Sequence, residues 1–244
     1  MKIRLYYFLI ASFLIVNSIP ASSQSRFSGW LASFNSIKTG KKTSIHAEFQ
    51  LRSSDQVNQI ETILLRSGFN YHLKKNMVLT AGYGYILNRH PLNILSAYGH
   101  EHRIWQQFLV SHAIKKNQLS HRFRLEERYR ERVVSTNGTT FFRDGYDYST
   151  RFRYFVRDII PFNNNPVFTN GLFAAIQNEV FVNVTDKKNV NGKFFDQNRF
   201  YVAAGYRFHK KFDLEIGYMN QHISGINKYS ANNHILQLAS YLRL

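Results

Sequence analysis

The stretch Leu119-Ser120-His121-Arg122-Phe123-Arg124-Leu125-Glu126-Glu127-Arg128-Tyr129-Arg130 changes character at every second residue. Each even position from 122 to 130 carries a charged side chain, whereas His121, Phe123, Leu125 and Tyr129 belong to the opposite row. A period of two residues is typical of a β-strand, because successive side chains of a strand point to opposite faces. The stretch therefore predicts a long strand that separates two different environments.

The same alternation recurs along most of the chain, and no stretch in between has a convincing helical period. Eleven stretches have the pattern of strands, at residues 27–37, 43–52, 60–71, 77–87, 99–114, 119–130, 145–157, 171–184, 198–208, 212–222 and 233–244. Short polar connections alternate with longer ones, the longer ones at 88–98, 131–144, 185–196 and 224–232. Short turns on one rim and long loops on the other are typical of outer-membrane β-barrels. The connection at 158–170 is longer than its place on the short-turn rim predicts.

The first residues have the layout of a secretory signal peptide. Lys2 and Arg4 precede an apolar run at 5–16, and small residues follow before position 24. The run is shorter than the roughly 20 residues that a membrane-spanning helix needs. We therefore expect a signal peptide at 1–23 and a single β-barrel domain at 24–244. The chain has no cysteine, which excludes disulfides and thiolate metal sites.

The barrel is soluble or membrane-spanning according to which row of side chains, the apolar or the charged one, faces outward. Tyrosine and phenylalanine collect near strand ends, as at Phe69, Tyr71, Tyr83 and Tyr85, which is typical of the aromatic girdles at two membrane interfaces. The mean hydropathy of −0.34 does not contradict this, because half of each strand of such a barrel faces water. We expect the apolar rows to face lipid and the charged rows to face the lumen. A soluble periplasmic barrel is the alternative.

The predicted fold is all-β, an antiparallel transmembrane barrel of the outer-membrane type with short periplasmic turns and longer extracellular loops. Single-chain bacterial barrels have even numbers of strands. Since eleven stretches are visible, we predict about 12 strands, with 10 as the alternative.

The charge balance is strongly basic, with a formal net charge of +17, of which Lys2 and Arg4 contribute two. Such a balance often indicates a nucleic-acid partner, but a secreted chain rarely meets nucleic acid. We expect a monomer whose partners are outer-membrane lipid, lipopolysaccharide and small anionic solutes, and no nucleic acid.

The charged rows supply the candidate site. The residues that we expect to line the lumen are Arg122, Arg124, Glu126, Arg128, Arg130, Asp147, Arg151, Arg153 and Glu179. Guanidinium groups in a pore can select anions. Alternatively, arginines and acids of neighbouring strands pair and fill a narrow lumen, which is the more common arrangement in barrels of this size. Both hold if the pairing leaves an excess of positive charge.

Catalytic and metal-binding patterns are weak. His100 and His102 could share one face of a strand, but no matching second pair of ligands is evident. Ser111 with His112, and Ser120 with His121, are sequence neighbours and so point to opposite faces. We predict no catalytic residue, metal or cofactor, and the sequence favours the absence of enzymatic activity.

Several strings resemble a known family. They are Glu101-His102-Arg103-Ile104-Trp105-Gln106-Gln107, His121-Arg122-Phe123-Arg124-Leu125-Glu126-Glu127-Arg128, Asn178-Glu179-Val180-Phe181, Phe195-Asp196-Gln197-Asn198-Arg199 and Asn232-Asn233-His234. Together they resemble a family of secreted Bacteroidota proteins catalogued as domain of unknown function 2490. The resemblance implies a secreted, outer-membrane β-barrel and carries no catalytic residues.

The leading hypothesis is a barrel in the outer membrane of a Gram-negative bacterium, exported through a cleaved signal peptide. It would be either a narrow channel for small anionic solutes or a structural barrel. The alternatives are a barrel-embedded enzyme that modifies lipid or lipopolysaccharide, and a partner of a larger outer-membrane assembly.

Overall fold

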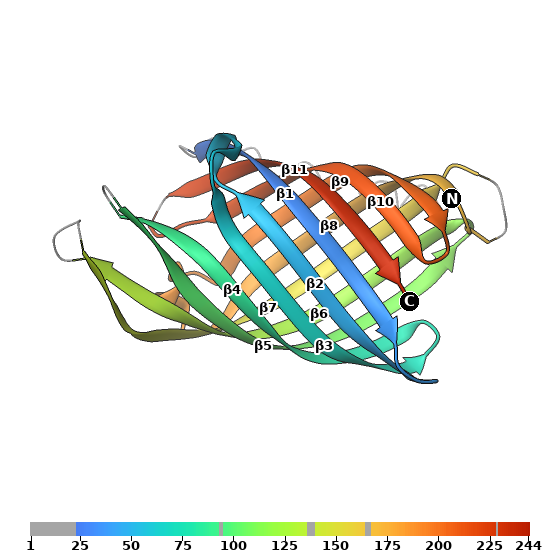
Figure 1. Ribbon diagram of the computed structural model, residues 1–244, viewed down its shortest axis with the longest axis horizontal. Coiled ribbons are helices and arrows are strands. Elements are labelled where there is room, and N and C mark those ends of the chain that lie inside the picture. Colours follow the sequence, from blue (N-terminus) through green and yellow to red (C-terminus); the bar gives the residue numbers. More distant parts are fainter. Residues whose placement is uncertain (1–22, 93–94, 136–139, 164–166, 228) are drawn as a thin grey trace, which may run out of the picture.

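The computed structural model describes residues 23–92, 95–135, 140–163, 167–227 and 229–244. Within these residues, 11 strands form one closed barrel (Figure 1). The strands are β1 Ser23–Lys38, β2 Thr43–Ser53, β3 Ile60–Lys74, β4 Met77–Leu92, β5 Leu95–Ile114, β6 Asn117–Ser135, β7 Phe141–Pro161, β8 Gly171–Thr185, β9 Phe195–His209, β10 Phe212–Ser224 and β11 Ser230–Arg243. The expected signal peptide lies outside the described residues except for Ser23.

Two short 3-10 helices lie in the connections, η1 at Asp55–Val57 and η2 at Lys187–Asn189. No helix in the described part of the chain is long and apolar enough to span a bilayer. The fold is thus the all-β barrel that the alternation predicts, and each observed strand overlaps one of the stretches recognised in the sequence.

The pairing of the first and last strands closes the barrel. Every pair of consecutive strands is antiparallel, whereas β1 and β11 run parallel, from Ser23 beside Ser230 to Ser36 beside Arg243. A ring of alternating strands with an odd number of members must contain one parallel pair. The described barrel therefore has 11 strands, close to the predicted 12, because the rule of even numbers holds only where every pair is antiparallel.

The barrel has two different rims. Because the number of strands is odd, the start of β1 and the end of β11 lie on different rims. We call the end with the β1–β2, β3–β4, β5–β6, β7–β8 and β9–β10 connections the turn rim, and the opposite end the loop rim. β1 begins at the loop rim, and β11 ends at the turn rim, where Leu244 is hydrogen-bonded to the backbone of Ser36 and Lys38. In Figure 1 the loop rim lies on the left.

Two connections expected to be long loops are largely strand. The β6 and β7 strands continue pairing to Ser135 and Phe141, and β4 and β5 continue to Leu92 and Leu95. In Figure 1 these two hairpins project beyond the rest of the loop rim. The expected loops at 131–144 and 88–98 are therefore mostly hairpin, because backbone pairing continues past the barrel wall.

The two faces of the wall have opposite character. On β6, the side chains of Phe123, Leu125 and Tyr129 are 39%, 36% and 36% exposed, whereas Arg124 and Glu126 are 1% and 0% exposed. Apolar side chains thus cover the outside and charged side chains fill the inside, which is the reverse of a soluble protein.

Glycines on β3 and β4 make room for the largest side chain inside the barrel. The ring of Trp105 lies over Gly68 and Gly82, and a Cβ atom at position 82 would be 2.6 Å from that ring and 2.2 Å from the carbonyl oxygen of Ser67. Such distances are far shorter than ordinary van der Waals contacts. The glycines therefore let Trp105 pack flat against the wall.

Candidate functional site: the arginine-lined lumen

Glu126 is the centre of a network of charges inside the barrel. Its carboxylate lies 2.6 Å from Arg153 Nη1, 2.8 Å from Arg151 Nη2 and 3.3 Å from Arg66 Nη2. Arg103 and Arg124 approach it at 4.0 Å and 3.8 Å. Because Arg66 lies on β3 and Glu126 on β6, this contact crosses the lumen instead of following the wall. The β6 strand thus supplies the central acid of the interior.

Other carboxylates in the lumen also serve two arginines each. Glu179 of β8 lies 2.7 Å from both Arg122 and Arg153. Glu101 of β5 lies 2.8 Å from Arg103 and 2.6 Å from Arg128. Shared carboxylates of this kind hold several guanidinium groups in place with few acids. The pairing therefore leaves more positive than negative charge inside the barrel.

The remaining residues predicted to line the lumen lie toward the loop rim. Arg130 is half-buried and donates a hydrogen bond to the backbone oxygen of Asn189, which belongs to η2. Asp147 is half-exposed and pairs at 3.3 Å with Arg132, whose side chain is exposed. Asp147 therefore does not join the network around Glu126, although its strand position suggested that it could.

Sequence reasoning missed most of the arginines that come from other strands. Arg52, Arg66, Arg103, Arg157 and Arg199 all line the same cavity as the β6 row. Arg52, Arg66 and Arg199 each stand between uncharged neighbours, so no run of charges marks them. Arg103 and Arg157 do have a signal, because Arg103 shares its row with Glu101 and Arg157 continues the row of Arg153. Assigning one inward row to every strand of a closed barrel would have found them.

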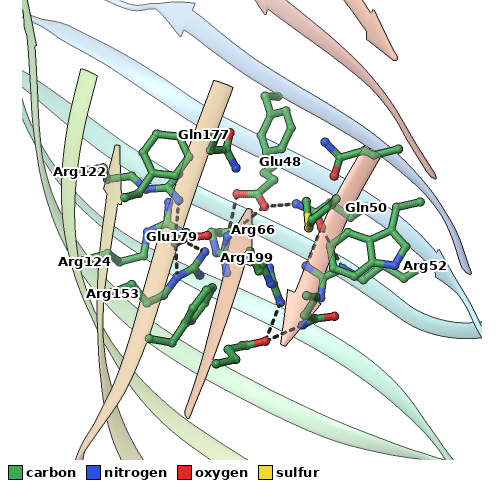
Figure 2. A pocket seen from close by; sticks show the side chains of 18 of the residues that line it. Glu48, Gln50, Arg52, Arg66, Arg122, Arg124, Arg153, Gln177, Glu179 and Arg199 are labelled. Carbon is green, nitrogen blue, oxygen red and sulfur yellow. Dashed lines mark hydrogen bonds and ion pairs between the residues drawn. The ribbon is translucent and has the colours of Figure 1, made fainter. Parts of the chain in front are cut away.

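The network surrounds a central cavity of about 440 Å³ (Figure 2). Among the described residues, its lining includes ten arginines but only two glutamates, Glu48 and Glu179. Glutamine amides and aromatic rings complete the wall, among them Gln50, Gln177 and Trp30. The cavity is thus strongly cationic and large enough to hold a small solute.

Three arginines of the lumen donate hydrogen bonds to glutamines, and of these only Arg124 also approaches a carboxylate among the described residues, that of Glu126 at 3.8 Å. Arg52 donates to Gln50 Oε1 at 3.0 and 2.6 Å, and Arg124 donates to Gln107 Oε1 at 2.9 and 2.6 Å. Arg199 donates to the corresponding oxygen of Gln197 at 3.5 Å. A neutral amide orients a guanidinium group without cancelling its charge.

A second cavity of about 300 Å³ lies toward the loop rim. It shares Trp30, Arg52, Gln221 and Ile223 with the central cavity. A solute that enters from the loop rim would therefore meet Arg52 and Trp30 before it reaches the central cavity.

Toward the turn rim, Phe168 fills the lumen. Its ring packs against Phe173 at a centroid distance of 5.8 Å, and the guanidinium group of Arg207 lies 4.3 Å above its centre. Arg207 is itself held by Asp213 at 2.8 Å. Phe168 comes from the connection between β7 and β8, whose length was unexpected on the short-turn rim.

The histidines and serines do not form a recognisable catalytic site. His102 faces outward and is hydrogen-bonded to Tyr83 at 2.5 Å, and His100 is bonded in the same way to Tyr85. Ser44 lies 2.9 Å from His72, but the described residues provide no carboxylate bonded to that histidine. They also contain no cluster of three His, Cys, Asp or Glu side chains that could hold a metal.

The two serine–histidine sequence neighbours lie as the alternation predicts. Ser111 is hydrogen-bonded to Ser120 at 2.9 Å on one face, whereas His112 stacks on His121 on the other. Neither neighbouring pair can therefore act as a nucleophile with its base.

The barrel is similar to a solved structure described as "NanC porin structure in rhombohedral crystal form". The two chains share 11% sequence identity at a TM-score of 0.50, over 89% of this chain and 98% of that chain. At this identity the likeness concerns the fold, a porin-like β-barrel. Comparison with curated proteins gave no match. The family described as "Protein of unknown function (DUF2490)" matches residues 27–232, and the chain therefore belongs to this family, as the sequence resemblance indicated.

Proposed function

We propose that the protein is an outer-membrane β-barrel that forms a narrow channel for small anionic solutes. The observation that carries this proposal is the lining of the central cavity, with ten arginines against two glutamates among the described residues. Rings of arginine and lysine select anions in pores, because their field favours negative ions and repels positive ones.

The outer face of the wall supports the membrane location. Large apolar side chains on separate strands are 44–53% exposed, including Leu79, Ile104, Ile176 and Ile216. In water this apolar surface would be exposed at a cost in stability, whereas in a bilayer it is in contact with lipid chains. Export through a cleaved signal peptide into the outer membrane of a Gram-negative bacterium is part of the proposal, as are lipid and lipopolysaccharide as neighbours.

The excess of charge distinguishes a channel from a structural barrel. Glu126, Glu179 and Glu101 neutralise part of the arginine network and stiffen the lumen. Arg52 and Arg199 are hydrogen-bonded to glutamines and form no ion pair within the described residues, so their charge is available to a solute. A barrel whose charges only filled the lumen would have no need for arginines held in this way.

The experiment is reconstitution of the refolded protein in planar bilayers. With a gradient of potassium chloride across the membrane, we expect a reversal potential that indicates chloride as the preferred ion. A preference for potassium, or the absence of any conductance by protein with the heat-modifiable mobility of a folded barrel, would remove the channel and leave the structural barrel.

A lipid-modifying enzyme is the second candidate, and the contact between Ser44 and His72 is the observation in its favour. Both residues point into the lumen near the turn rim, and Ser44 is buried. Incubation with phospholipid vesicles tests it: release of fatty acid that the Ser44→Ala variant abolishes would support the enzyme over the channel.

A further inference from the structure

Two guanidinium groups lie against one indole ring between the two cavities. The guanidinium carbon of Arg52 is 4.1 Å from the centre of the Trp30 ring, and that of Arg199 is 5.1 Å from it. The two like charges can be no farther apart than the sum of these distances. At such a separation in a partly buried site, two positive charges repel each other noticeably.

Among the described residues, neither arginine has a carboxylate within ion-pair distance. No ion pair within the described part of the chain includes Arg52 or Arg199, although Glu48 lies two positions from Gln50 on β2 and pairs with Arg66 at 2.8 Å. Glutamine and glutamate have the same size, so an acid at position 50 or 197 would fit where the amide lies. The chain instead has Gln50 and Gln197, which orient the guanidinium groups without forming an ion pair with them.

Both arginines retain free hydrogen-bond donors that face the cavity. Arg52 uses its Nε and Nη2 atoms on Gln50, and Arg199 uses Nη2 on Gln197. If the amide of Gln221 is turned, its carbonyl oxygen also accepts from Arg199 Nη2 at 3.1 Å, which is again a neutral partner. Within the described residues, the Nη1 atoms of both arginines have no hydrogen-bond partner, and both side chains line the central cavity.

This arrangement favours one class of anion. A carboxylate has two oxygens in one plane, and a single guanidinium group can occupy both. A phosphate or sulfate group directs its oxygens to several sides, so it can accept hydrogen bonds from two guanidinium groups at once, and its second charge compensates the second arginine. Chloride offers no directional acceptor.

We propose that Arg52 and Arg199, arranged around Trp30, bind a tetrahedral oxyanion, either free phosphate or sulfate or such a group on a small solute. The site deepens the proposed function, because it lies where a solute from the loop rim would enter the central cavity. Figure 2 shows Arg52 beside Gln50, with Arg199 between them and the β6 arginines.

Calorimetric titration of the refolded protein in detergent tests this site without requiring an open pore. Sodium phosphate, sulfate and acetate are compared at constant ionic strength. We expect saturable binding of phosphate and sulfate, and none of acetate. Arg52→Gln and Arg199→Gln should each weaken phosphate binding by about tenfold, the effect of losing one charge-assisted hydrogen bond. The exposed Arg132→Gln removes the same charge at the loop rim and should leave the affinity unchanged.

The variant Gln50→Glu tests the same site with every arginine in place. The new carboxylate would neutralise Arg52, so phosphate binding should fall although the packing is preserved. Titration with glycerol 3-phosphate distinguishes the source of the anion: tighter binding than that of free phosphate indicates a phosphorylated solute, and weaker binding indicates the free ion.

Three results would overturn the site: no saturable binding of phosphate, acetate binding as tightly as phosphate, or phosphate binding unchanged in the Arg52, Arg199 and Gln50 variants. The heat-modifiable mobility of each variant on a gel shows that it is folded. Phosphate binding without conductance would contradict the proposed channel and support the oxyanion site. An anion-selective current without phosphate binding would support the channel and contradict the site.

Discussion

Arg66 of β3 reaches across the lumen to Glu126 of β6, with 3.3 Å between Arg66 Nη2 and Glu126 Oε1. The same arginine also holds Glu48 of β2 at 2.8 Å. Strands that are not neighbours in the wall are therefore joined through buried charges, which stiffens the centre of the lumen.

Replacing Glu126 by glutamine should destabilise the barrel strongly. Arg66, Arg151 and Arg153 would lose a shared carboxylate in a buried site, and removing one partner of such a group costs roughly 3–5 kcal/mol. The denaturant midpoint of unfolding measures the effect. Glu127→Gln, the neighbour on the outer face, is the matched control and should change the midpoint little. Equal midpoints for the two variants would contradict a central role for Glu126.

Alanine at position 82 should disturb folding, whereas alanine at position 84 should not. A Cβ atom at Gly82 would collide with Trp105 and with the Ser67 backbone, while at Gly84 its nearest contact would be an ordinary 3.6 Å. Overpacking of this kind costs roughly 1–3 kcal/mol. Both glycines belong to the inward row of β4, so the comparison isolates the effect of these two close contacts. The yield of heat-modifiable protein after refolding provides the measurement.

A carboxylate beside Arg124 should weaken the preference for anions. Gln107→Glu would place a negative charge on the atom that now accepts two hydrogen bonds from Arg124. The reversal potential in a salt gradient should shift toward cations. Gln106→Glu adds the same charge to the outer face of β5 and should not shift it. If both variants behave like the unmodified protein, the lumen does not control the current.

Removing the ring of Phe168 should increase conductance. The side chain fills the lumen toward the turn rim, against Phe173 and Arg207. Phe168→Ala would widen the lumen at this position, so the single-channel current should rise at the same voltage. Phe162→Ala removes an exposed ring from the same connection and is the control. An unchanged current in the Phe168 variant would show that the narrowest part of the lumen lies elsewhere.

Residues 119–130 are enough to predict the kind of wall that this chain builds. A strand's side chains alternate by local backbone geometry, so the sequence alone separates Arg124 and Glu126 from Phe123 and Leu125. The same rule locates the other strands and leads to the all-β barrel and its inside-out character. The family follows from short strings on those strands.

The number of strands and the pairing inside the lumen needed the tertiary structure. Whether the sheet closes after 11 strands, with β1 parallel to β11, depends on the curvature and stagger that the whole sheet adopts. For the same reason, no local pattern shows that Arg66 reaches Glu126 while Arg52 and Arg199 meet at Trp30. A side chain's face is set by its own strand, but its partner across the lumen is set by the closure of the whole barrel.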